Sequence, residues 1–358
     1  MWGRGYPAPT CTGWRLEETM SLIQNLIRRL LLMIPMAIGI TLLLFVVTHI
    51  VPVNPLAVIL TERSMDDPEA IHAATEKWGL DKPLPVQYLV YLKNLLQGDL
   101  GTSFKTKNPV ASDLKDFLPA TIELSICSFI FAILLGLPLG IISGYKSGSF
   151  VDQVTRIISL LGASMPPFWS GLLVLFVFYY KLDWAPGPGR INPRIGAPES
   201  VTGLFVFDSL LKGNMPAFWD SLHHLVLPSI ILGWFTLALI SRITRSSMLE
   251  VLSQDYIRTA RAKGLAEKLV ILKHALRNAL IPLVTLVGLA FAGLMSGAIM
   301  TETIFSWPGI GRYAVESAAN LDYPAITGTT LLIAIIYMLV NIFVDMLYTI
   351  IDPRIREG

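Results

Sequence analysis

Long uncharged runs of apolar residues alternate with polar stretches along most of this chain. The first run extends from Leu30 to Thr48 without a charged residue, and about 20 helical residues are enough to cross a bilayer. Five comparable runs follow, so we expect membrane-spanning helices over residues 30–51, 120–142, 157–179, 225–241, 281–301 and 325–350. The pattern therefore predicts an all-α integral membrane protein with six transmembrane helices.

Two long polar regions separate these runs. Residues 52–119 show helical spacing at Tyr88, Leu92 and Leu95, and we expect a small folded cap outside the membrane. Residues 183–198 are too rich in Pro and Gly for regular structure. Residues 205–225 carry Phe and Trp and are expected to lie along the membrane interface.

The basic residues predict which side of the membrane each segment faces. Of the 28 Lys and Arg residues, sixteen fall in segments expected inside the cell, seven in residues 52–119 and five in the other outer segments. Short cytoplasmic loops carry an excess of Lys and Arg, whereas long loops cross regardless of charge. Both termini are therefore predicted to be cytoplasmic, with residues 1–29 and 351–358 as tails.

Residues 1–19 differ from the rest of the chain, because Pro, Gly and aromatic residues occur there without a period. An amphipathic stretch begins at Met20, so this methionine would be a reasonable start site for translation. We expect translation to begin at Met20, or residues 1–19 to be an irregular part of the cytoplasmic tail.

The stretch from Asp255 to Pro282 is the one long basic insertion between two apolar runs. Asp255 is placed to cap a helix start, and Gly264 is placed where a helix could end in the left-handed conformation. A second helical run is expected from about Glu267. A loop that only fixes topology needs no such spacing, so we interpret the stretch as two short helices against which a soluble partner docks.

Composition excludes several classes of function. Only 15% of the residues are charged, against about 25% in a typical soluble domain, and a net charge of +2 gives no support for nucleic-acid binding. The five His and two Cys residues show no metal-site spacing. The sequence contains neither a phosphate-binding GxxxxGK[ST] loop nor a credible Ser/His/Asp arrangement, so we expect no enzyme activity and no cofactor in this chain.

A few polar or helix-breaking residues lie in or near the predicted spans. We expect Glu123 and Glu302 to sit among lipid headgroups at the outer surface. Asp345, with Asn341 one turn before it, lies deeper and is expected to pair with a basic group or, less plausibly, to couple an ion. Pro166 and Pro167 interrupt the third span, which indicates either a helix that lines a cavity or a packing kink.

Several segments together resemble the membrane subunit of ABC importers, in the dipeptide/oligopeptide branch and of the "B" type. They lie between about Met20 and Arg356 and read GLDKPLPVQYLVYLKNLLQGDLGTSF, LPATIELSI, GASMPPFWSGLLV, DYIRTARAKGL with HALRNALIP, ETIFSWPGIGRYAVESA and YTIIDPRIR. The resemblance implies a type I importer fold, with an ABC transmembrane core over residues 116–349 and an extracytoplasmic cap between the first two helices. It also implies a multi-pass protein of a bacterial inner membrane.

The resemblance further implies a coupling helix over about residues 256–263. The family's motif there has a glutamate, two alanines, three variable positions and a glycine; this chain matches it only at Ala260 and Gly264, and Arg258 replaces the glutamate. The implied ATPase-coupling residues are Tyr256, Arg258, Thr259, Ala260, Arg261, Lys263, Gly264 and Leu265.

The implied partners are a second homologous permease subunit, two ATPase subunits that use ATP and Mg²⁺, and an extracytoplasmic peptide-binding protein. Nickel, glutathione and oligosaccharide remain alternatives to peptide, since relatives in the family handle them. Two alternatives from other classes are an ion-coupled carrier that depends on Asp345, and a structural scaffold.

Overall fold

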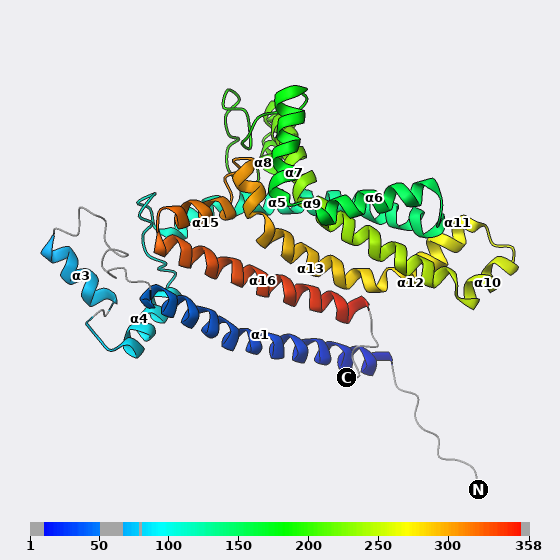
Figure 1. Cartoon of the computed structure of the whole chain (residues 1–358). Coiled ribbons are helices and arrows are strands. Elements are labelled where there is room, and N and C mark those ends of the chain that lie inside the picture. Colours follow the sequence, from blue (N-terminus) through cyan, green and yellow to red (C-terminus); the bar gives the residue numbers. More distant parts are fainter. Residues whose placement is uncertain (1–10, 51–66, 79–80, 352–358) are drawn as a thin grey trace, which may run out of the picture.

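The computed structural model describes residues 11–50, 67–78 and 81–351, and these residues are helical apart from connecting loops and one isolated bridge between Thr102 and Pro109. The prediction of an all-α protein is confirmed. The elements, drawn in Figure 1, are α1 (Cys11–Ile50), α3 (Pro68–Trp78), α4 (Leu84–Leu96), α5 (Val110–Tyr145), α6 (Phe150–Ser164), α7 (Pro167–Val174), η2 (Leu175–Lys181), α8 (Phe205–Leu211), α9 (Met215–Leu252), α10 (Asp255–Ala262), α11 (Glu267–Leu269), η3 (Val270–Ala275), α12 (Leu276–Ala279), α13 (Ile281–Gly297), α14 (Ile299–Ile304), α15 (Ile310–Ala319) and α16 (Tyr323–Ile351).

Five helical segments in the described part of the chain are long and apolar enough to cross a membrane, and a bent pair of helices makes up to six. The five segments are Ile27–Val47, Val110–Tyr145, Met215–Leu252, Leu286–Ile304 and Tyr323–Val344. Several are longer than the apolar runs, because polar residues continue the same helices beyond the expected ends.

The third expected span, residues 157–179, is not one straight helix. It divides into α6 and then α7 with η2, and the two parts meet at an angle of 110°. The break falls at Met165 and Pro166, where the sequence Pro166-Pro167 removes two backbone donors. At the start of α7, the carbonyl of Pro166 accepts hydrogen bonds from both the hydroxyl and the amide of Ser170, each at 3.1 Å.

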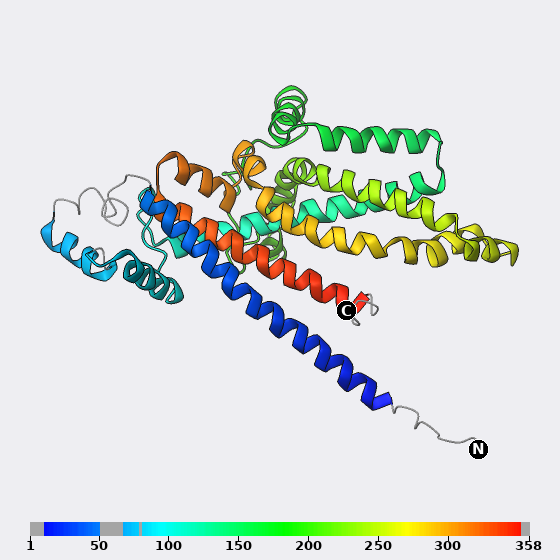
Figure 2. The same cartoon turned by 60° about the horizontal axis from the view of Figure 1, so that its bottom comes forward.

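The N-terminal segment also departs from expectation. Helix α1 begins at Cys11, so residues 11–29 continue the first span as helix rather than forming an irregular tail. Residues 1–10 lie outside the described part of the chain. Helix α1 runs along α16 at the edge of the bundle (Figures 1 and 2).

Helices α5 and α9 form the centre of the bundle, and glycines let them approach closely. A methyl group at Gly140 would lie 2.5 Å from Cβ of Thr244 and 2.7 Å from the carbonyl oxygen of Ser241. Gly136 and Gly144, one turn away on either side, face α9 in the same way. Small residues four apart are the usual device by which helices pack in lipid, where no hydrophobic force joins them.

Polar groups tie the segment before α5 to the segment that contains α15. Ser103 donates its hydroxyl to Asp322 at 2.5 Å, and Tyr313 donates to Asp113 at 3.0 Å. Lys105 and Arg312 both pair with Glu316. Except for the Arg312–Glu316 pair within α15, these contacts join residues about 200 positions apart, and they hold one end of the bundle together.

Candidate functional site

Helix α10 projects at one end of the bundle, between the end of α9 and the start of α13 (Figure 1). Its N-cap is Gln254, and no side chain caps it, so the expected capping role of Asp255 is wrong. Asp255 is instead the first helical residue, where its carboxylate still interacts favourably with the helix dipole. The helix ends where Gly264 adopts φ +76°, which confirms the left-handed conformation expected there.

The inner face of α10 is packed against neighbouring helices. Ile257 and Ala260 are buried in one apolar cluster with Met248 of α9, and with Val270 and Ala275 of the π-helix η3. Leu265, half-buried, packs against the same cluster. Because one cluster includes residues of α9, α10 and η3, packed side chains join α10 to the long helix before it and to the short helices that lead into α13.

Two polar contacts reinforce this packing. Asn278 donates its side-chain amide to the hydroxyl of Tyr256 at 2.7 Å, across 22 positions of sequence. Arg261 donates two hydrogen bonds to Glu267, at 2.7 and 3.2 Å. The hydrogen bonds to Glu267 hold the pKa of Arg261 above its usual value, and the contact bridges the turn at Gly264.

The outer face of α10 is polar and exposed. Arg258 is paired with Asp255 at 3.3 Å, but both side chains are largely in solvent, so the pair adds little stability. Thr259 and Lys263 are exposed on the same helix. The eight expected coupling residues therefore come together on one helix and its turn, with Ala260 in the buried face and most of the others available to a partner.

A buried ion pair beside this helix was not expected from the sequence. Asp152, in the first turn of α6, accepts two hydrogen bonds from Arg245 of α9, at 2.7 and 2.9 Å, together with one from Ser143 of α5. The backbone amide of Gly148 completes the site at 2.9 Å. The only signal for this pair in the sequence is the charge of Arg245, and that charge by itself indicates only which side of the membrane the segment faces.

The other expected site residues are not part of this group. Pro166 and Pro167 lie at the bend between α6 and α7. The side-chain oxygen of Asn341 is buried without a hydrogen-bond partner in the described structure. The side chain of Asp345 lies outside the described part, so its expected pairing stays a prediction.

The expectation that Glu123 and Glu302 sit among headgroups is wrong, because both carboxylates are buried inside the protein. Glu302 accepts hydrogen bonds from Thr121 at 2.6 Å and from the amide of Arg312 at 3.0 Å. A methyl group at Gly309 would collide with the same carboxylate. Glu302 therefore organises the turn that leads into α15, and the two glycines of the PGIG sequence make room for it.

Glu123 pairs with Arg190 from the Pro- and Gly-rich loop, and the guanidinium of Arg190 also lies 3.7 Å from the ring centre of Phe205. The amide of Val206 donates to the same carboxylate at 2.8 Å. These contacts fasten the loop to α5. Sequence reasoning missed the pair because its members are 67 positions apart.

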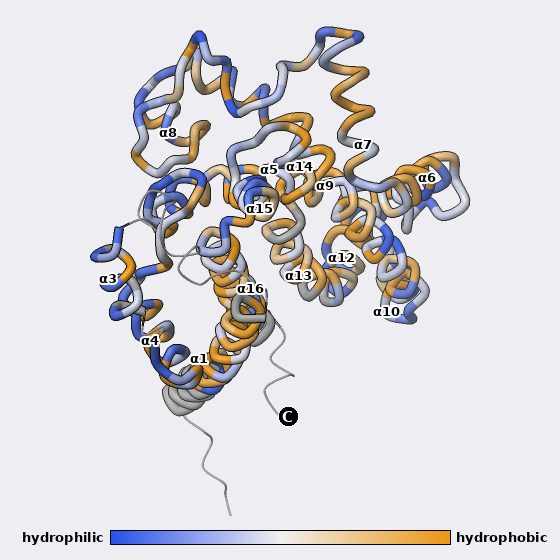
Figure 3. Tube along the Cα trace, turned by 60° about the vertical axis from the view of Figure 1, so that its left-hand side comes forward, coloured by the Kyte–Doolittle hydropathy of each residue, from blue (hydrophilic) through white to orange (hydrophobic). Residues whose placement is uncertain are grey.

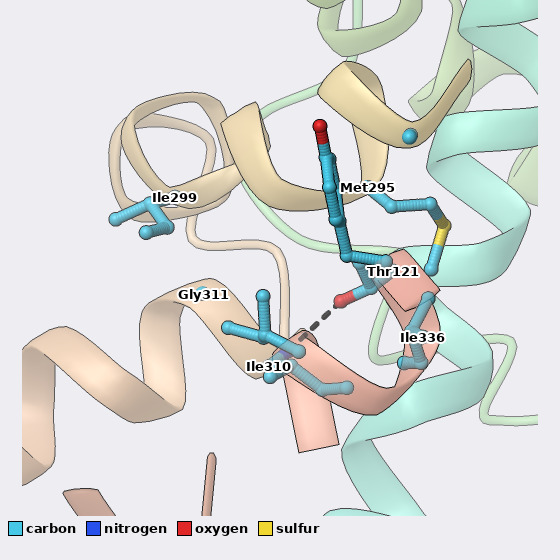
Figure 4. A pocket seen from close by; sticks show the side chains of 9 residues that line it. Thr121, Met295, Ile299, Ile310, Gly311 and Ile336 are labelled. Carbon is cyan, nitrogen blue, oxygen red and sulfur yellow. Dashed lines mark hydrogen bonds between the residues drawn. The ribbon is translucent and has the colours of Figure 1, made fainter. Parts of the chain in front are cut away.

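A small cavity lies beside the turn that Glu302 organises (Figure 4). It is lined by Thr121, Met295, Ile310, Ile336 and other mainly apolar residues, and has a volume of about 10 Å³. Thr121 accepts a hydrogen bond from the amide of Ile310 at 2.8 Å at its edge. About one water molecule would fill this space, so the cavity is too small to hold a peptide.

The described residues contain no group of three or more His, Cys, Asp or Glu side chains that could hold a metal ion.

The family described as "Binding-protein-dependent transport system inner membrane component" matches residues 136–357, and the N-terminal part of such components matches residues 22–125. The chain is 50% identical to the dipeptide transport system permease protein of Alkalihalophilus pseudofirmus, over 92% of this chain and 98% of that protein. It is 46% identical to the di/tripeptide transport system permease protein of Pseudomonas aeruginosa, over 92% and 98%.

Among solved structures, the chain is similar to the MetNI methionine ABC transporter in an inward-facing conformation. The TM-score is 0.47 and the identity 16%, over 65% of this chain and 93% of that one, which is too low to assign the fold by itself. The sequence matches, in contrast, extend over almost the whole chain. The chain belongs to the family of binding-protein-dependent transport system inner membrane components.

Proposed function

We propose that this chain is the membrane-spanning permease subunit of an ATP-driven importer for di- or oligopeptides, in a bacterial inner membrane. Relatives at 46–50% identity, whose names state dipeptide or di/tripeptide transport, support the peptide substrate. The proposal includes six spans with both termini in the cytoplasm, an extracytoplasmic region over residues 52–119, and an importer core over residues 116–349.

The observation that carries the proposal is the construction of α10. One face of this helix is buried against α9 and η3, and its other face offers Arg258, Thr259 and Lys263 to solvent. A loop that only crossed between spans would not need a shared apolar core. A helix that takes up force from a docked partner and transmits it to α9 and η3 needs one exposed face and one packed face.

The partners that complete such a machine are a second permease subunit, two ATPase subunits and a peptide-binding protein on the outer side. The ATPase subunits would bind ATP and Mg²⁺, and this chain would hold no cofactor. Closure of the ATPase dimer would act on α10 and shift the population of inward- and outward-facing states through contacts that differ between them. The midplane pathway would lie between the two permease subunits.

The test is uptake of a radiolabelled dipeptide by vesicles that contain the purified complex, with ATP on the side that carries α10. We expect uptake that needs ATP, the binding protein and both ATPase subunits. Uptake by this chain without ATPase subunits would overturn the proposal in favour of an ion-coupled carrier. ATP-driven uptake of nickel, glutathione or an oligosaccharide, but not of peptides, would keep the mechanism and replace the substrate.

A further inference from the structure

Helix α4 is fixed to the apolar part of α1, although it belongs to the polar region expected outside the membrane. The hydroxyl of Tyr88 lies 3.0 Å from that of Thr41 and donates to the carbonyl of Ile38 at 3.2 Å. The ring of Phe45 lies 5.3 Å from the ring of Tyr88 and 6.0 Å from that of Tyr91. Figures 1 and 3 show α4 beside one end of α1.

These contacts fix the depth of α4 along α1. The apolar span of α1 runs from Ile27 to Val47. Thr41 precedes Val47 by six residues, which corresponds to about 9 Å at 1.5 Å per residue. Phe45 precedes it by only two. The face of α4 that carries Tyr88 and Tyr91 is therefore level with the last turns of the span, not above them.

Another face of α4 is apolar and exposed. It carries Val86, Leu89 and Leu96, which are 38%, 63% and 88% exposed. Lys93 is exposed beside these leucines. In water such a stripe would be unfavourable, since burial of apolar surface contributes about 25 cal/mol per Å². A basic residue beside an apolar stripe is typical of helices that lie in a membrane interface.

The lipid bilayer is the occupant that best fits this face. Leu43, on the span to which α4 is attached, is itself 62% exposed and stands where acyl chains would meet it. Leu89 of α4 is exposed at a similar depth, because the neighbouring Tyr88 contacts Ile38 and Thr41 of the same span. Lys93 can extend its ammonium to a lipid phosphate while its methylene groups stay in the apolar layer.

We propose that α4 lies within the interfacial layer of the bilayer, with Leu89 and Leu96 in contact with lipid. The region between the first two spans is then a membrane-anchored element rather than a cap held only by protein. Its depth is set by lipid on one face and by α1 on the other. This inference does not depend on the identity of the transported substrate.

The test uses nitroxide labels on the full complex in vesicles of phosphatidylethanolamine and phosphatidylglycerol. Labels are placed at Leu89→Cys and Leu96→Cys in a background in which Cys11 and Cys127 are replaced by serine and alanine. Leu43→Cys serves as the lipid-facing control and Glu199→Cys, at an 82% exposed side chain, as the water-facing control. The measurement compares the collision rate of each label with oxygen and with a water-soluble nickel chelate.

We expect the oxygen-to-nickel ratio at Leu89 and Leu96 to be several-fold above that at Glu199 and close to that at Leu43. A ratio equal to that at Glu199 would place the stripe in water and overturn the proposal. Low collision rates with both reagents would also overturn it, because they would mean that a protein partner covers the helix. Dipeptide uptake by each labelled complex is measured in parallel, so a failure of transport is recognised separately.

Discussion

Arg245 of α9 donates two hydrogen bonds to Asp152 of α6, and the carboxylate of Asp152 is almost completely buried. The same carboxylate accepts from Ser143 near the end of α5. Three helices thus meet at one carboxylate, close to the end of the bundle from which α10 projects. The indole N–H of Trp234 in α9 also donates to the carbonyl of Ile158 in α6 at 3.2 Å, so the Asp152–Arg245 pair is one of several contacts that position α6 against α9.

Removal of the Asp152 charge should destabilise this end of the bundle. In Asp152→Asn the guanidinium of Arg245 loses its charged partner; because Arg245 is 23% exposed, the cost is below the roughly 3–5 kcal/mol lost when one member of a fully buried ion pair is removed. We expect a lower midpoint of thermal unfolding for the purified complex in detergent. Arg156→Gln is the matched control, since Arg156 lies 3.9 Å from the same carboxylate but is well exposed. An unchanged midpoint in Asp152→Asn would show that the pair contributes nothing to stability.

Close packing of α5 on α9 should be sensitive to a single methyl group. In Gly140→Ala the new Cβ would meet Thr244 and the backbone of Ser241 at 2.5 and 2.7 Å, so the helices must separate. Overpacking of this kind costs about 1–3 kcal/mol. We expect reduced thermal stability and reduced transport. Gly39→Ala in α1, where nothing lies within 4 Å of the added carbon, should change neither.

Features of the chain that depend on local sequence were predictable. Apolar runs indicated the helices, and Gly264 indicated the end of α10 because a left-handed residue is commonly glycine. The Pro166-Pro167 sequence indicated an interruption, but not an angle of 110°, because the direction of a bend depends on the helices that pack against it. The cap at Gln254 was missed because a residue that favours capping, Asp255, stood one position later.

Features that depend on distant partners were not predictable. Glu123 and Glu302 were placed in headgroups because the sequence showed charges near span ends and nothing that could pair with them. Their partners, Arg190 and Thr121, are 67 and 181 positions away, and only the folded chain brings them together. Tyr88 likewise suggested a helix in residues 52–119, but not that it reaches Thr41, 47 positions earlier in the chain.

The conformation at Gly264 leads to a prediction about the docking helix. Because φ is +76° and nothing lies within 4 Å of an added carbon, a side chain there would be strained but not in collision. Gly264→Val should weaken binding of the ATPase subunits and reduce uptake, since a β-branched residue at positive φ is unfavourable by more than the roughly 1–2 kcal/mol of an ordinary side chain. Gly264→Asn is the control, because asparagine tolerates this conformation. Co-purification of ATPase subunits measures the effect, and equal recovery with all three residues would reject the role of the turn.

The charges on α10 lead to a separate prediction. Arg258→Glu places an acidic group on the exposed face without disturbing the packed face, and we expect weaker ATPase binding that changes with salt concentration, since exposed charges are screened. Arg261→Glu should have a larger effect, because it also breaks the pair with Glu267. Arg261→Glu combined with Glu267→Arg restores that pair and should recover part of the loss. Tight assembly that is independent of salt in Arg258→Glu would exclude an electrostatic contribution from this position.

The loop before α8 should be sensitive to acid. Burial alone would raise the pKa of Asp208, but hydrogen bonds from the Thr202 hydroxyl and from the amides of Val201, Thr202 and Gly203 outweigh it and hold that pKa below its usual value. A group with a lowered pKa in the folded state adds stability that is fully present above its unfolded pKa and is lost as the pH falls through the folded one. We expect proteolysis of residues 183–204 to accelerate in the wild type as the pH drops below about 4. Asp208→Asn should be cut more readily at neutral pH and should lack that acid-dependent step. A variant whose cleavage follows the wild-type pH profile would mean that another group controls the loop.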